Sequence, residues 1–181
     1  MMMPLRGALS PLGRGLGAAE LAYLLYDAFT TDRAAGAVNG TSAEPTGGTR
    51  TVVDTNNKLS ITGGQLSFAA GGVGGTDPRL TYSSLSRTAG KVFTTNVVAN
   101  GNLYAGFSTS TVATLNGPDY LFSSNGTIIY SHGGSTTNLG VSVAGTSYQL
   151  SIILRSTGAY YYIKGGIYTN WTLLWVDNSS T

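Results

Sequence analysis

The chain has 181 residues, which is enough for one domain with a hydrophobic core and a short appendage. Only 10% of the residues are charged, against a usual share of about 25%, and the net charge is +2. This small charge, spread over scattered lysines and arginines, argues against a nucleic-acid or anionic-membrane partner. The absence of cysteine excludes disulfides, thiol catalysis and thiolate metal sites.

The low charge has two interpretations, and the composition leaves both open. A surface rich in serine, threonine and asparagine can be soluble without many charges, as in extracellular proteins. Alternatively, much of the surface lies against other subunits, because charge is what keeps soluble monomers apart.

The first segment, Met1–Ala19, has neither the period of a strand nor that of a helix. Its prolines lack amide donors and its glycines lose much backbone entropy when they are fixed, so we expect an extended arm. It does not resemble a signal peptide, because Glu20 and Asp27 interrupt the apolar stretch that follows. No stretch reaches the 18 apolar residues of a membrane span. The side chains expected to anchor this arm to neighbouring subunits are Leu5, Arg6, Leu9, Leu12, Arg14 and Leu16.

The domain itself is expected over residues 20–181. Glu20–Phe29 fits a short helix or a first strand, and we favour a strand for its second half because the last strand otherwise lacks a partner. A polar loop follows to Arg50. Strand signals with turn residues between them then recur at the spacing of an antiparallel all-β domain. We predict strands at Thr49–Asp54, Lys58–Ile61, Gln65–Ala69, Arg79–Ser86, Lys91–Val98, Leu103–Ser108, Tyr120–Ser123, Thr127–His132, Gly140–Ala144, Tyr148–Ser156, Ala159–Lys164 and Trp171–Val176.

The C-terminal strands carry the most distinctive aromatic residues. In an extended strand Tyr161 points opposite to Tyr160 and Tyr162, and Trp171 and Trp175, four residues apart, share a face. These rings, with Tyr168, suit a core, a sugar-stacking surface or a subunit interface.

The segments LLYDAFTTDRAAG, KLSITGGQLSFAAGG, SYQLSIILRSTGAYYYIKGG and WTLLWVD resemble, in this order, the laminin-G-like and concanavalin A-like jelly-roll domains of bacterial surface and phage virion proteins. The resemblance covers about Leu24 to Asp177. It implies a two-sheet antiparallel jelly-roll sandwich in which a first strand near Tyr26–Phe29 pairs with the last strand. It also implies glycan or protein ligands, bound in some members through calcium.

Catalytic and metal sites are weakly represented. No strand presents the pair of carboxylates that a glycosidase needs, and His132 is the only imidazole, so we expect no enzyme. Calcium needs only carboxylates, carbonyls and water, and neighbouring first and last strands would bring Asp27, Asp32 and Asp177 together. The alternative is that these acids cap loops and end a strand. We expect no other cofactor.

The sequence therefore predicts a non-enzymatic structural protein, set in a phage virion as a head decoration, head fibre or tail protein. Its partners would be other virion subunits and further copies of itself, without nucleic acid or membrane. The alternative is a carbohydrate-binding module that is secreted or displayed at a cell surface.

Overall fold

In the computed structural model every regular element among the described residues is a β-strand, and the twelve strands form four antiparallel sheets. None of these residues belongs to a helix long and apolar enough to cross a membrane. The described residues are 25–69, 78–82, 89–98, 102–107, 120–125, 128–132, 136–141 and 145–178.

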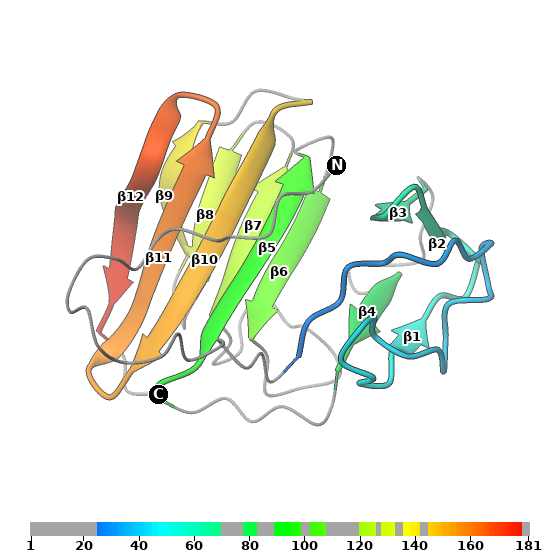
Figure 1. Cartoon of the computed structure of the whole chain (residues 1–181). Helices are drawn as coiled ribbons and strands as arrows, with labels where there is room; N and C mark the ends of the chain where they lie inside the picture. The colour runs from blue at the N-terminus through cyan, green and yellow to red at the C-terminus, as the bar shows by residue number, and fades with distance from the viewer. Residues whose placement is uncertain are drawn as a thin grey trace, which may run out of the picture.

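A four-stranded sheet faces the viewer in Figure 1, in the order β12-β11-β10-β5. The last three strands of the chain follow one another as hairpins, and β5 adds to β10 from an earlier part of the chain. The strands are β5 (Val92–Val98), β10 (Ser147–Arg155), β11 (Gly158–Gly165) and β12 (Tyr168–Asp177).

A second four-stranded sheet lies behind the first, with its strands paired in chain order (Figure 1). These strands are β6 (Asn102–Phe107), β7 (Tyr120–Asn125), β8 (Ile128–His132) and β9 (Thr136–Val141). We call the two sheets together, residues 92–177, the sandwich.

The main core lies between these two sheets. Alternation along β10 and β11 sends Ile152 and Tyr161 inward, and both are wholly buried. The ring of Phe122, from β7, meets Tyr161 edge-on with 5.3 Å between centroids. Burying each such side chain contributes about 1.5–3 kcal/mol, so this layer dominates the stability of the sandwich. The buried cluster is Tyr120, Phe122, Tyr148, Leu150, Ile152, Leu154, Ala159, Tyr161 and Ile163.

Residues 27–82, which we call the N-terminal region, contain two small sheets of two strands each. They have their own core, and in the described part of this region its buried cluster consists of Val38, Leu59 and Ile61. In Figure 1 this region stands beside the sandwich, next to β5 and β6. Its pairs are β1 (Thr51–Val53) with β4 (Arg79–Thr81), and β2 (Leu59–Thr62) with β3 (Gln65–Phe68).

The predicted all-β class and antiparallel pairing are confirmed. Each of the twelve predicted strands overlaps an observed one, although the ninth begins four residues earlier than predicted, at Thr136. Gly63 and Gly64 join β2 to β3 with φ of 58° and 76°, as a tight hairpin turn requires. The arm at Met1–Ala19 lies outside the described residues, and a single domain over 20–181 stays a prediction.

The predicted pairing of a first strand with the last one is wrong. Tyr26–Phe29 forms no strand, and Asp27 instead makes an isolated bridge with Pro45 in the N-terminal region. Among the described residues β12 pairs only with β11. The polar contacts of Asp27 explain the difference, because they hold this segment against the loop at Glu44–Arg50.

Candidate functional site

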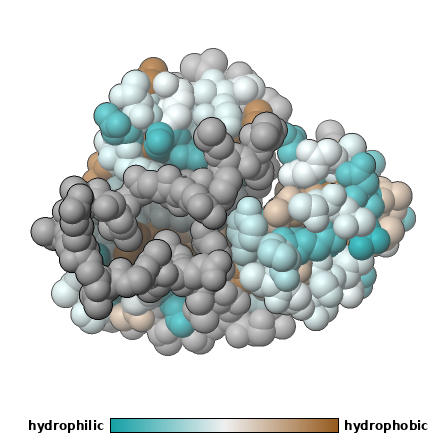
Figure 2. Space-filling model, viewed as in Figure 1, coloured by the Kyte–Doolittle hydropathy of each residue, from teal (hydrophilic) through white to brown (hydrophobic). Residues whose placement is uncertain are grey.

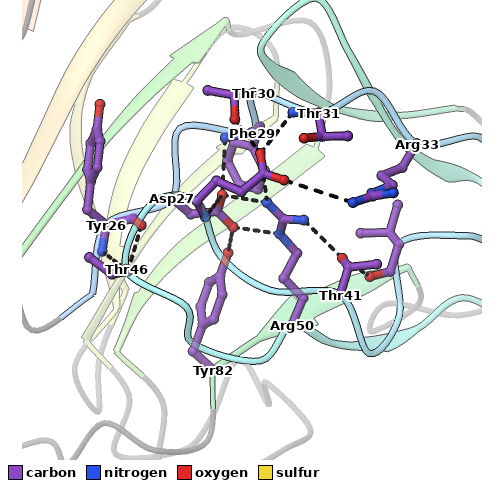
Figure 3. A network of polar contacts seen from close by, with 12 residues as sticks. Tyr26, Asp27, Phe29, Thr30, Thr31, Arg33, Thr41, Thr46, Arg50 and Tyr82 are labelled. Carbon is purple, nitrogen blue, oxygen red and sulfur yellow. Dashed lines mark hydrogen bonds and ion pairs between the residues drawn. The ribbon is translucent and has the colours of Figure 1, made fainter.

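Two features stand out among the described residues: a buried polar network and an exposed sheet face. The network is centred on the Asp27 carboxylate (Figure 3). Arg50 donates to both carboxylate oxygens, from Nε to Oδ2 and from Nη2 to Oδ1, each at 2.7 Å. The Tyr82 hydroxyl also donates to Oδ2, and the Phe29 amide donates to Oδ1. The carboxylate thus joins the start of the N-terminal region to its end, just after β4.

The Arg50 side chain is completely buried, and its guanidinium has both hydrogen-bond partners and an aromatic partner. Nη1 donates to the Thr41 hydroxyl at 2.9 Å, and the guanidinium carbon lies 5.4 Å from the centroid of the Phe29 ring. A buried guanidinium is costly unless it is paired and hydrogen-bonded, and here the bidentate carboxylate and the aromatic ring supply both kinds of contact.

Glu44 forms the outer part of the network. One of its oxygens accepts hydrogen bonds from the Thr30 hydroxyl and, at 2.8 Å, from the Thr31 amide. Its other oxygen makes a looser ion pair with Arg33 at 3.9 Å. This part is more open to solvent than Arg50, so its ion pair contributes less.

The network keeps its acids ionised. Burial alone would raise the pKa of Asp27, but the hydrogen bonds from Arg50 and Tyr82 outweigh it and hold that pKa below its ordinary value. Hydrogen bonds from Thr30 and Thr31 lower the pKa of Glu44 to about 2. Burial, and then the bond to Asp27, raises the pKa of Tyr82 above its usual range.

The shifts move the pKa values of Asp27 and Glu44 down and that of Tyr82 up, away from neutral pH, where a general acid or base works best. The donors of the network are directed at partners within the protein. We therefore interpret the network as a structural clamp and not as a catalytic centre.

The calcium candidate stays a prediction, and the contacts of its three acids do not favour it. Asp27 is occupied by Arg50, and Asp32 accepts the Gly63 amide at 2.9 Å beside the β2–β3 turn. Asp177 ends β12 in the sandwich, opposite Ala159. The described residues contain no group of three side chains that could hold a metal ion. The three acids stay apart because the first segment does not pair with β12.

The alternation of the three consecutive tyrosines is as predicted. Tyr161 is wholly buried, whereas Tyr160 and Tyr162 are partly exposed on the other side of β11. The prediction that Trp171 and Trp175 share a face assumed that side chains alternate without a break along the strand, and this assumption is wrong. The register shifts between Tyr161, opposite Trp175, and Tyr162, opposite Leu173, so an extra residue interrupts the alternation.

The outward side of the first sheet, which we call the outer face, carries ordered cross-strand rows. Directly opposite residues of antiparallel strands point to the same side of a sheet. Since Ile152 and Tyr161 point into the core, their neighbours point outward. The rows are Val92, Ile153, Tyr160 and Val176; then Thr94, Ser151, Tyr162 and Leu173; then Asn96, Gln149 and Lys164.

The outer face is apolar in the row of Val92 and polar in the row of Asn96, and beyond that row an exposed Val98 lies opposite Ser147. Val92 is 59% exposed and Leu173 is 46% exposed, which is high for aliphatic side chains in a sheet. Thr94 and Ser151 contact each other through their hydroxyls at 3.1 Å. On the side of the whole molecule that Figure 2 shows, the visible surface of the described residues is mostly white and teal, with brown in separate spots.

Comparison of the chain with family models, with curated proteins and with solved structures finds no match. The jelly-roll resemblance therefore stays a prediction from the residues.

Sequence reasoning missed the partners of Asp27. Arg50 and Tyr82 are 23 and 55 residues away from it, and no local pattern links them. One signal was available: in a chain with so few charges, an arginine that ends a glycine- and threonine-rich loop is a candidate for a specific pair. Tyr168 packs against the sandwich core, and the arm residues Leu5 to Leu16 lie outside the described residues.

Proposed function

We propose that the protein is a non-enzymatic structural component of a larger assembly, with a phage virion as its setting. In this proposal the two sheets belong to a jelly-roll domain, and the segment Met1–Ala19 is an arm that fastens it to neighbouring subunits. The observation that carries the proposal is the outer face, where Val92 and Leu173 expose aliphatic surface on a sheet with few charges. Exposed apolar rows of this kind mark contact surfaces.

The buried clamp also supports a structural role. A protein that serves as a part of a particle needs a stable shape more than a reactive centre. In the described part of the chain, the acids with clearly lowered pKa values, Asp27 and Glu44, bind partners within the fold. The low charge of the chain also fits close packing against other subunits.

The arm can be tested with the full-length chain. Leu9→Asp together with Leu12→Asp should abolish incorporation into particles, because two carboxylates cannot enter an apolar groove without a large desolvation cost. The measurement is the amount of the protein in purified particles, by mass spectrometry. Ser10→Asp, which adds charge but keeps the leucines, is the matched control and should be incorporated. Normal incorporation of the double variant would reject the arm as an anchor.

Carbohydrate binding is the second candidate, and a specific observation favours it. Tyr160 and Tyr162 present their side chains on the same face as Asn96 and Gln149, which provides rings for stacking and amides for hydrogen bonds. On a glycan array, Tyr162→Ala should then lose a signal that the control Tyr26→Ala keeps. The absence of any glycan signal from the full-length chain would reject this candidate.

A further inference from the structure

We propose that the outer face of the β12-β11-β10-β5 sheet binds a second copy of the same face, related by a two-fold axis that runs parallel to the strands between β10 and β11. The inference goes beyond the proposed function and does not depend on it, since a pair of copies can form without a particle.

The side chains favour a protein surface as the occupant. The first outward row is Val92, Ile153, Tyr160 and Val176, and the next row ends in Leu173. Sugars are held by aromatic stacking and hydrogen bonds, and aliphatic side chains supply neither. They do pack well against other apolar side chains in the layer between two sheets.

The arrangement of the rows favours a second copy. An axis between β10 and β11 exchanges β10 with β11 and β5 with β12 across the interface. It therefore places Ile153 opposite Tyr160 of the second copy, and Val92 opposite Val176. In the next row Thr94 meets Leu173. Apolar residues thus meet apolar residues along the whole first row.

The few charges of the face are also compatible with this symmetry. Lys164 and Arg155 are its charged residues, and the same axis places them opposite Gln149 and Gly158 of the second copy. An axis perpendicular to the strands would instead turn the lysine end of each face toward the arginine end of the other. Either axis brings like charges near one another at the ends of the face, so the charges do not decide between them. The parallel axis is favoured because it places the apolar first row against itself, whereas the perpendicular axis places that row against the polar row of Asn96, Gln149 and Lys164.

The size of the face sets the expected strength. Four strands about 4.8 Å apart, and about 28 Å long at about 3.3 Å per residue, cover about 500 Å² on each copy. The total of about 1,000 Å² is at the lower limit for a specific interface. Packed sheets also rotate by about 30°, so the pairing is closest in the central strands. We therefore expect a weak dimer with a dissociation constant in the micromolar range.

Sedimentation velocity of the full-length chain, from about 1 to 100 μM, tests the proposal. Val92→Lys and Leu173→Lys each place a charge in the apolar rows at an exposed position, and should weaken association at least tenfold. Ile167→Lys is the matched control, since Ile167 is 79% exposed in the turn between β11 and β12, away from the face. It should leave the dissociation constant within about twofold of that of the unmodified chain.

Cross-linking tests the symmetry. Because the chain has no cysteine, each cysteine variant carries a single reactive thiol. A mixture of Val92→Cys and Val176→Cys chains should react with a short thiol cross-linker faster than either chain alone, because only the mixed pair is opposed. Equal rates would overturn this axis.

A full-length chain that stays monomeric at all concentrations, or a control that weakens association as much as Val92→Lys, would overturn the interface. Glycan binding by a monomer, lost in Val92→Lys, would assign the face to carbohydrate instead.

Failure of the dimer and failure of the proposed function are separate results. The Leu9→Asp and Leu12→Asp variant should still dimerise, because its changes lie outside the outer face.

Discussion

The N-terminal region and the sandwich are held together by different forces. Among the described residues, the cluster between the two four-stranded sheets of the sandwich contains nine buried side chains. The N-terminal region has only two-stranded sheets and buries three aliphatic side chains in its core. A two-stranded sheet is marginally stable by itself in water. The comparison shows how a short segment with little apolar surface can be closed by one buried carboxylate and its partners.

The largest expected effect tests the clamp. Arg50→Met should destabilise the N-terminal region by about 3–5 kcal/mol, because it leaves the Asp27 carboxylate buried without its counter-ion. Urea unfolding followed by far-UV circular dichroism measures it. Both tryptophans lie in β12, so their fluorescence reports on the sandwich and should change less.

Arg33→Met is the control for Arg50→Met. Arg33 makes only a loose ion pair with Glu44, at 3.9 Å and partly exposed, so its loss should cost about 1 kcal/mol or less. Equal stability of the two variants would contradict the clamp.

An intermediate effect should appear with pH. Asp27 and Glu44 have folded pKa values below their ordinary ones, so their stabilisation is complete above the unfolded pKa values and is lost as pH falls through the folded ones. We expect the free energy of unfolding to fall from about pH 4.5 toward about pH 2. Tyr82 has the opposite sign: its raised pKa gives stability below pH 10 that is lost above it. Unfolding curves at stepped pH measure both, and a profile that is flat below pH 4.5 would refute the effect of the acids.

The smallest effect concerns the sandwich. Ile152→Val removes one buried methylene and should cost about 0.5–1.5 kcal/mol, with the same value at pH 3 and pH 7, because no charge is involved. Ile167→Val makes the same change at a side chain that is 79% exposed and should be nearly neutral. If the cost of Ile152→Val depended on pH as strongly as the N-terminal region does, the two regions would not be stabilised separately.

Some features of the fold could be predicted from the sequence and others could not. The β-strands were predictable because each depends on alternation and on nearby turn residues, as in Gln65–Phe68 after Gly63 and Gly64. The burial of Tyr161 between Tyr160 and Tyr162 followed from the same alternation. The faces of Trp171 and Trp175 did not, since a register shift in β12 depends on how that strand fits β11.

Residues adjacent in the chain were enough to predict the all-β character of the described residues, the places of their strands, and the buried tyrosine of β11. The partners of Asp27, which are Arg50 and Tyr82, and the shared face of Val92 and Leu173 could be found only from the packing of the whole chain. Such partners come from distant segments. Burial and hydrogen-bond geometry, which emerge only when the whole chain packs, select among them.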